Sequence, residues 1–340
     1  MRLVTRADFD GLVCGALVTK FERVDDYLFV EPKFMQDGLV EIRSGDIITN
    51  LPYHPSCTLW FDHHITNTTP NFPQPIMPGK GGFRLAPSAA RVVYEYYSEI
   101  GVRREAQLKA DQPPAETGSS KINAQEGIRQ QAMGSSETII GFLNSERMTY
   151  LLHEADRIDA GKLDKDDVLN PQGYVLISMT TDGKNAGDEP YWLKIIELLR
   201  ETTLEETLND PEVKRRCQQI RDEQEKLRRL LLERTRIKSN VIYCDLRGVK
   251  EIPDGNRFLI FTLFPKGNIQ VKVAYDTQRE NTTAISVGYN IFNPTSKVNV
   301  GELLKNYGGG GHKVVGSSRV PNDQAEQAIK EIVAAVTEKA

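Results

Sequence analysis

The sequence has few cysteines and no long apolar run. Its four cysteines, Cys14, Cys57, Cys217 and Cys244, form no C-x-x-C pair, which argues against a zinc site and a disulfide framework and favours free thiols in a reducing compartment. No stretch approaches the roughly 20 apolar residues that a membrane span requires. The first residues enter a strand-like run rather than a signal peptide. We therefore expect a cytoplasmic protein with no membrane partner.

An excess of positive charge is also absent. The chain carries 43 Lys and Arg against 47 Asp and Glu, a net charge of −4, which excludes a general basic coat for duplex nucleic acid. An anionic ligand must therefore be met by a local site. The hydrophobic fraction of 39% and the charged fraction of 26% are typical of a folded globule. A chain of 340 residues exceeds the usual size of one hydrophobic core, which predicts two domains.

Short β-rich runs alternate with helical patterns in the first 100 residues, which predicts a mainly parallel α/β sheet. Val13, Leu17 and Phe21 recur at four-residue spacing and predict a helix over 11–21 with one buried face. A second helix is expected to stop at Gly101. The expected strands are 3–5, 27–30, 46–49 and 58–61, and the second helix covers 86–100.

Residues 103–138 contain no aromatic side chain, and Pro113, Pro114 and Gly118 interrupt any helix. We interpret this range as a polar insertion in the N-terminal domain. A helical pattern resumes over 139–154.

A long charged segment covers 211–238. Its apolar residues follow a three-four seam with Gln224 as the one polar member, which predicts a single long linker helix. Residues 212–238 carry ten Lys or Arg and five Asp or Glu, a local excess of +5. Two interpretations stay open: the charges form the solvated face of an interdomain or homodimer helix, or they follow a nucleic-acid backbone.

A second β-rich block follows the long helix, with 266–268 as a hairpin turn between its middle strands. A short helix over 300–306 precedes a run of four glycines, and an amphipathic helix ends the chain. The expected strands are 240–246, 257–264, 269–276 and 284–289. The predicted organisation is an α/β domain over 1–200, a linker helix over 201–238, and a smaller α/β domain with a mixed sheet over 239–340.

Ionisable side chains gather after the first and fourth predicted strands. Asp8 and Asp10 follow the first strand, and Asp62, His63 and His64 close the fourth. Carboxylates at strand ends, where open α/β sheets form their ligand crevice, suit Mg²⁺ or Mn²⁺ beside a phosphate. The added imidazoles favour Mn²⁺. An aspartate-rich turn with a helix cap is the alternative interpretation of the first pair.

Gly308, Gly309, Gly310 and Gly311 precede His312 near the end of the chain. Glycines allow backbone N–H groups to approach an anion in conformations that other residues rarely reach, which predicts a phosphate cradle. An ordinary flexible loop has the same composition.

Together the aspartates around Phe9, the Asp62-His63-His64 run and the glycine run resemble the DHH phosphoesterase superfamily in its two-domain form, with a C-terminal DHH-associated domain. The motifs fall in family order and span nearly the whole chain. The resemblance is strongest to the exopolyphosphatase-related branch and weaker to RecJ-type nucleases. It implies a hydrolase that cleaves a phosphoester or phosphoanhydride bond in a nucleotide, a short single-stranded oligonucleotide or polyphosphate.

The resemblance also implies one or two Mn²⁺ ions, with Mg²⁺ as the alternative, in a cleft between the domains, with a water activated for attack on phosphorus. Carried over residue by residue, it gives Asp10, His63 and either Asp156 or Asp159 to one ion, and Asp8 to the other. Asp156 is preferred because it comes first after the helical pattern.

Other residues receive substrate roles from the same resemblance. His64 would contact the phosphate or the leaving group, and Asp62 would orient the histidine pair. Further phosphate contacts are expected from the glycine run, His312, Arg84 and Arg319.

The sequence departs from the family pattern at three places. Arg6 stands where His or Asp usually begins the first motif, and arginine cannot ligate a metal. Asn50, a neutral and weaker metal ligand, stands where the family has an acidic residue that bridges both metals, and 286–288 lack an expected arginine. We infer that the Arg6 guanidinium takes over the charge of one ion. The alternative is that Arg6 pairs with Asp8 or Asp10 and closes the site, which would suit a non-catalytic nucleotide or phosphate sensor.

Overall fold

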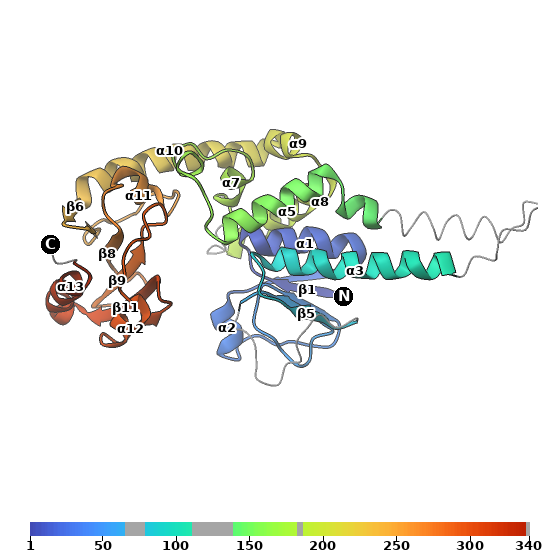
Figure 1. The fold of residues 1–340 in the computed structure, drawn as a ribbon, viewed down its shortest axis with the longest axis horizontal. Helices are drawn as coiled ribbons and strands as arrows, with labels where there is room; N and C mark the ends of the chain where they lie inside the picture. The colour runs from blue at the N-terminus through green and yellow to red at the C-terminus, as the bar shows by residue number, and fades with distance from the viewer. Residues whose placement is uncertain (65–78, 111–138, 182–185, 338–340) are drawn as a thin grey trace, which may run out of the picture. The chain divides into compact units, whose positions relative to one another are not determined.

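The computed structural model describes residues 1–64, 79–110, 139–181 and 186–337. The chain divides into two compact units, one formed by Met1–Lys162 and Gly173–Lys214, the other by Leu163–Gln172 and Arg215–Ala340. Each unit has its own β-sheet (Figure 1). Within the described ranges no helix combines the length and apolarity needed to cross a membrane. All four cysteines are free thiols.

The first unit contains a five-stranded sheet in the order β2-β1-β3-β4-β5, and every neighbouring pair is parallel. This confirms the predicted parallel α/β sheet. Strands β1 to β4 lie within about a residue of their expected positions, and β5 is an additional strand that the sequence analysis missed. The strands are β1 (Arg2–Thr5), β2 (Asp26–Phe29), β3 (Asp46–Thr49), β4 (Leu59–Asp62) and β5 (Gly81–Phe83).

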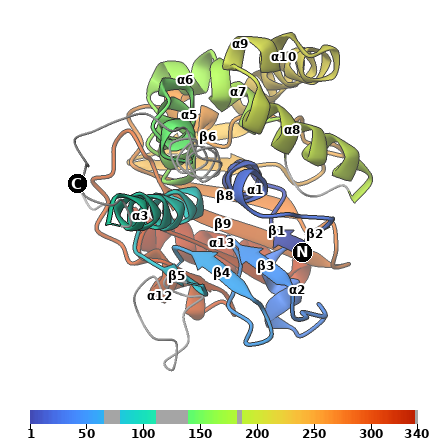
Figure 2. The same cartoon turned by 90° about the vertical axis from the view of Figure 1, so that its right-hand side faces the viewer.

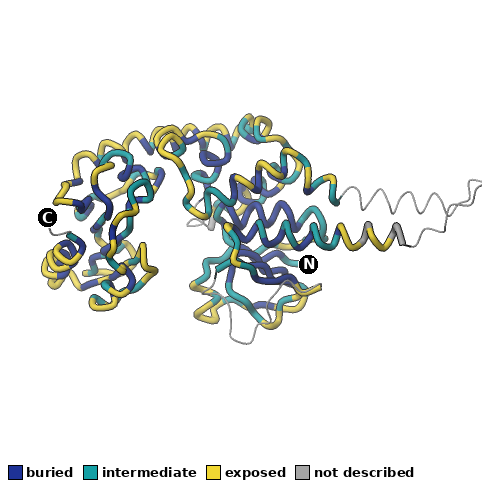
Figure 3. Tube along the Cα trace, viewed as in Figure 1, coloured by how far each residue is buried: buried dark blue, intermediate teal, exposed yellow. Residues whose placement is uncertain are grey.

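Helix α1 (Phe9–Phe21) is buried on every side from Phe9 to Val18, so the prediction of a single buried face was wrong. The helix contacts β1 and β3 and also three helices that cover it, namely α3 (Ala89–Ala110), α5 (Glu146–Asp159) and α8 (Glu189–Glu201). Figure 2 shows α1 and α3 side by side over the sheet, and Figure 3 shows the continuous burial of α1. A helix that is apolar all round is the expected sequence for such a position.

Helix α3 continues through Gly101, which corrects the predicted stop. One glycine inside a helix costs only about 1 kcal/mol, too little to end a helix with good formers on both sides. The first residues of the predicted polar insertion therefore belong to α3, and 111–138 lie outside the described residues. Helix α5 begins after Ser145, whose hydroxyl accepts the N–H of Met148.

Shorter helices complete the first unit: α2 (Pro32–Gln36), α7 (Gly173–Ser178), η2 (Ala186–Asp188) and α9 (Leu204–Asn209). The range 201–238 is therefore not one helix. Thr203 caps α9, and Asp210 accepts the N–H groups of Glu212 and Val213 at the start of α10 (Pro211–Arg234). These caps separate α8, α9 and α10.

The second unit contains a six-stranded sheet in the order β10-β11-β9-β8-β7-β6. Strands β7 and β8 are parallel and the other pairs are antiparallel, which confirms the predicted mixed sheet. Helices α12 (Val300–Lys305) and α13 (Asn322–Val336) pack on one face. The strands are β6 (Thr235–Lys238), β7 (Val241–Asp245), β8 (Ile269–Tyr275), β9 (Thr282–Tyr289), β10 (Gly310–Gly311) and β11 (Val315–Pro321).

The predicted strand over 257–264 and the hairpin at 266–268 were both wrong. This range forms helix α11 (Leu259–Leu263), whose apolar side chains pack against Leu227 and Leu231 of α10. Parallel neighbours such as β7 and β8 need a crossover, and α11 lies in it. Gly267 is required by packing, because a Cβ there would lie 2.3 Å from Cγ1 of Ile242.

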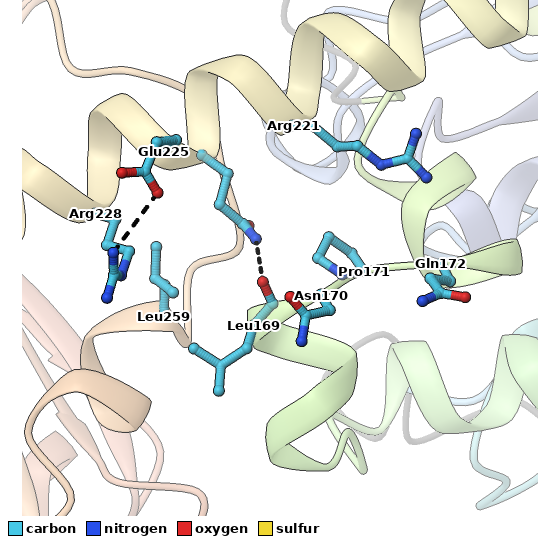
Figure 4. A pocket seen from close by; sticks show the side chains of 9 residues that line it. Leu169, Asn170, Pro171, Gln172, Arg221, Glu225, Arg228 and Leu259 are labelled. Atoms are coloured by element: carbon cyan, nitrogen blue, oxygen red, sulfur yellow. Dashed lines mark hydrogen bonds and ion pairs between the residues drawn. The ribbon is translucent and has the colours of Figure 1, made fainter.

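Gln224, the polar member of the α10 seam, is buried and fully used. Its Nε2 donates to the carbonyls of Val168 and Leu169 at 3.2 and 3.3 Å, and its Oε1 accepts the N–H of Asn256 at 3.0 Å. These bonds attach α10 to the segment around α6 (Lys165–Leu169). A pocket of about 640 Å³ lies beside them in the second unit (Figure 4).

Candidate metal and phosphate site

Polar side chains gather at the carboxyl edge of the parallel sheet in the first unit. Because all five strands run in the same direction, the segments that follow them meet at one edge, where open α/β sheets bind ligands. Following the strand order from β2 to β5, these residues are Glu31, Asp8, Asn50, the Asp62-His63-His64 run and Arg84.

Asp10, His63 and Asp159 form a group whose ligand atoms all lie within 4.8 Å of one another. His63 Nε2 is 3.3 Å from Asp159 Oδ2 and 3.9 Å from Asp10 Oδ2. Its Nδ1 lies 2.9 Å from the carbonyl of Ala86, to which it must donate, so a neutral ring presents its Nε2 lone pair to the carboxylates. This buried Nε2 has no hydrogen-bond partner in the described part of the chain. The three residues therefore fit a divalent cation.

Asp10 is buried in the first turn of α1, and its two oxygens accept the N–H groups of Ala89 and Ala90 at 2.8 and 2.9 Å. These bonds attach the start of α3 to the site. Burial, together with the charges of Asp159 and Asp8, raises the pKa of Asp10 well above its usual value. Burial also raises the pKa of Asp159. A bound cation would offset the repulsion between these two carboxylates.

Asp156 has different partners. Its Oδ1 accepts the hydroxyl of Ser88 at 2.6 Å, and its Oδ2 accepts Nε of Arg91 at 3.0 Å. Its charge is therefore already neutralised by an arginine of α3. Of the two aspartates left open by the sequence analysis, the geometry favours Asp159 as the ligand rather than the preferred Asp156.

Both oxygens of Asp8 are bonded within the protein. Oδ2 lies 2.6 Å from a terminal nitrogen of Arg6, and Oδ1 accepts the amide of Asn50 and the backbone N–H of Gly11, each at 2.9 Å. The bond to Gly11 makes Asp8 the N-cap of α1. The structure therefore contains both features that the sequence analysis gave as alternatives. Asp8 caps a helix, and Arg6 pairs with Asp8.

Glu31 is a site residue that the sequence analysis missed. Its Oε2 lies 3.3 Å from the second terminal nitrogen of Arg6. Its position two residues after β2, at the same edge of the sheet as Asp8 after β1, was the signal that could have identified it.

Asp62 is fully buried and holds His64. Its Oδ1 lies 2.9 Å from Nδ1 of His64 and also accepts the backbone N–H of that residue. This hydrogen bond raises the pKa of His64 above its usual value. His63 is oriented instead by the Ala86 carbonyl, so Asp62 acts on one histidine rather than both. Ligand atoms of Asp62, His63 and His64 also lie close enough together to share an ion.

The two arginines expected to bind phosphate are held in ion pairs. Arg84 bonds to Glu95 and Glu99 of α3 at 2.6 and 2.8 Å, and Arg319 of β11 bonds to Asp276 at 2.6 Å. A phosphate would have to compete with these carboxylates.

The glycine run belongs to the second unit, where β10 pairs with β11. A Cβ at Gly309 or Gly311 would lie 2.3 Å from a carbonyl oxygen of β11, and Gly308 has a φ of +68°. The tight turn therefore explains these three glycines. A Cβ at Gly310 would meet nothing within 4 Å in the described part of the chain, so the turn does not explain this fourth glycine. His312 follows the glycine run and is exposed.

Comparisons with known proteins place these observations in a wider context. No family model matched the sequence, and no curated protein matched it. Among solved structures, a pGpG-specific phosphodiesterase, PggH from Vibrio cholerae, is similar with a TM-score of 0.72 and 30% identity over 98% of both chains. RecJ from Thermus thermophilus, in complex with Mn²⁺, is similar with a TM-score of 0.50 and 13% identity, over 100% of this chain and 53% of that one. This chain thus spans about half of the RecJ chain, and that likeness concerns the fold alone.

Proposed function

Because this chain belongs to the DHH superfamily of phosphoesterases, in its two-domain form with a C-terminal DHH-associated domain, we propose that it hydrolyses a phosphodiester bond in a short linear dinucleotide such as pGpG. The observation that carries this proposal is the group formed by the buried Asp10 and the partly buried His63 and Asp159 at the carboxyl edge of the parallel sheet. The likeness to PggH over 98% of both chains supports the substrate class.

Asp10, His63 and Asp159 would hold a divalent cation, with Mn²⁺ favoured because one of the three ligands is an imidazole. Such an ion lowers the pKa of a water and neutralises charge on the phosphate oxygens. Hydrogen bonds to other groups of the protein would hold these ligands in place. The Ala86 carbonyl fixes the ring of His63, and the start of α3 fixes both oxygens of Asp10.

His64 is proposed to contact the phosphate or the leaving oxygen. Asp62 engages its Nδ1, so Nε2 is the ring nitrogen left for the substrate. The side chain is 38% exposed, whereas that of His63 is 10% exposed. A ligand can therefore reach His64 more readily than it can reach His63.

The glycine run of the second unit is proposed to contact a phosphate of the substrate. Open space beside Gly310 and the exposed position of His312 support this role. A cytoplasmic location is part of the proposal, and the four free thiols support it because a reducing compartment preserves them.

The direct test is product analysis with the purified full-length chain. We expect Mn²⁺ to support conversion of pGpG to GMP, with slower or no release of phosphate from polyphosphate. His153→Ala, which changes an exposed histidine of α5, serves as the matched control for His63→Ala. Failure to cleave pGpG, short oligonucleotides and polyphosphate with either Mn²⁺ or Mg²⁺ would contradict the proposal.

The pairing of Arg6 with Asp8 favours a second candidate function, a nucleotide or phosphate sensor that does not turn its ligand over. The same experiment separates the two functions. A sensor would bind pGpG in a metal-dependent manner and leave it intact over hours.

A further inference from the structure

We infer that this chain binds one divalent cation at the carboxyl edge of its parallel sheet, because the guanidinium of Arg6 occupies the position beside Asp8 that a second cation would need. The inference shares with the proposed function only the assignment of the Asp10–His63–Asp159 group as the metal site.

The oxygens of Asp8 face hydrogen-bond donors. Oδ2 is 2.6 Å from Arg6, and Oδ1 accepts two N–H groups, from Asn50 and Gly11. A cation could bind Oδ1 only by displacing one of these two N–H groups, and at Oδ2 it would lie beside the positive charge of Arg6. Asp8 also belongs to neither group of described His, Cys, Asp and Glu side chains that lie close enough to share an ion. The residues around Asp8 therefore do not fit a second metal.

The charge at this position opposes a second cation as well. Although burial of Arg6 acts against its charged form, Asp8 and Glu31 raise the pKa of the guanidinium above its already high usual value. The guanidinium is permanently charged, and its two terminal nitrogens form ion pairs with Asp8 and Glu31. A divalent ion placed beside it would be repelled by this positive charge.

Asn50 points its donor toward Asp8. Its Nδ2 bonds to Asp8, and its left-handed backbone, with a φ of +56°, is stabilised by a bond from its N–H to the carbonyl of Phe61. The free acceptors are elsewhere: Asn50 Oδ1, Asp62 Oδ2 and His63 Nε2 are buried without a hydrogen-bond partner among the described residues. Of these three acceptors, only His63 Nε2 belongs to the Asp10–His63–Asp159 group. Each oxygen of Asp10 accepts a single N–H group, which leaves a lone pair for an ion. Asp8 differs, because its Oδ1 accepts two N–H groups and its Oδ2 faces the Arg6 guanidinium.

In this protein the Arg6 guanidinium, with a single fixed positive charge, would take the place of the second divalent ion of a two-metal enzyme. A clamp of two ions on both the attacking and the leaving oxygen is then not available. The side chains around the ion, His64 among them, must supply the second half of that stabilisation.

Metal counting tests the inference without any turnover. Calorimetric titration of the full-length protein with Mn²⁺ is expected to give one tight ion per chain, and electron paramagnetic resonance to give the spectrum of an isolated Mn²⁺ ion. Two tight ions, or an exchange-coupled pair, would overturn the inference whether or not pGpG is cleaved. Absence of cleavage with one ion bound would overturn the proposed function alone.

Two variants show whether the named residues exclude the second ion. Arg6→His combined with Asn50→Asp supplies an imidazole and a carboxylate beside Asp8, and should raise the count to about two. Arg23→His, on an arginine that is 90% exposed, is the matched control and should leave it at one. A folded double variant that still binds one ion would refute the role of Arg6 and Asn50.

Asp8→Asn provides a second route if the double variant does not fold. Since Asp8 is not a ligand in this account, Asp8→Asn should still bind one Mn²⁺. Its loss of Mn²⁺ affinity should be at least tenfold smaller than the loss in Asp10→Asn. Equal losses in the two variants would show that Asp8 binds the ion and would overturn the inference.

Discussion

His63 Nε2 lies 3.3 Å from Oδ2 of Asp159, although the histidine directly follows β4 and the aspartate lies in the last turn of α5. This approach, with Asp10 Oδ2 3.9 Å from the same nitrogen, brings together three side chains that could hold a metal ion. The three side chains come from separate elements, so each can be substituted by itself. Measuring metal affinity and folding stability for each variant should then show whether a substitution affects metal binding, folding or both.

His63→Ala should weaken Mn²⁺ binding by more than about 100-fold, since losing a direct ligand costs more than losing an outer partner. Cleavage of pGpG should fall with it. Calorimetric titration of His63→Ala beside the His153→Ala control checks this expectation. Unchanged metal affinity in His63→Ala would contradict the site assignment.

Asp159→Asn and Asp156→Asn should have opposite effects. Asp159→Asn should lose Mn²⁺ binding, while Asp156→Asn should keep it and lower the free energy of unfolding by about 1–3 kcal/mol, because Arg91 loses its charged partner. Metal titration and urea unfolding of both variants test the pair. If Asp156→Asn lost Mn²⁺ binding and Asp159→Asn kept it, Asp156 would be the ligand instead of Asp159.

His64→Ala should lower the rate of cleavage by roughly 10²–10⁴-fold, the range for loss of a group that transfers a proton in the transition state. Mn²⁺ affinity should change little, because the proposed ligand is His63. Steady-state kinetics at saturating Mn²⁺ give the rate, and titration gives the affinity. A parallel loss of metal would instead place His64 in the coordination shell.

Gly310→Ala should weaken substrate binding without lowering the melting temperature, because the added Cβ has free space. Gly309→Ala is the matched control and should destabilise the second unit, since its Cβ would lie 2.3 Å from the carbonyl of Ser317. Binding assays and thermal unfolding of both variants separate the effects. Wild-type affinity in Gly310→Ala would argue against a phosphate cradle.

Several local features were predictable from the sequence because they depend on near neighbours. Short runs of β-formers between helical patterns marked β1 to β4, and the polar residues after β1 and β4 marked the edge of the sheet. Predictions failed where packing overrode local preference. The apolar run around Phe261 has strand-like composition, yet it folds as α11 in the crossover between parallel neighbours.

The sequence by itself determined that Asp8, Asp10 and the Asp62-His63-His64 run share one edge, because parallel strands end on the same side. Only the tertiary structure distinguishes Asp156 from Asp159, since α5 presents one to Arg91 and the other to His63. It likewise decided that Arg6 pairs with Asp8 and Glu31. Such choices depend on distances between side chains far apart along the chain, which no local pattern of residues encodes.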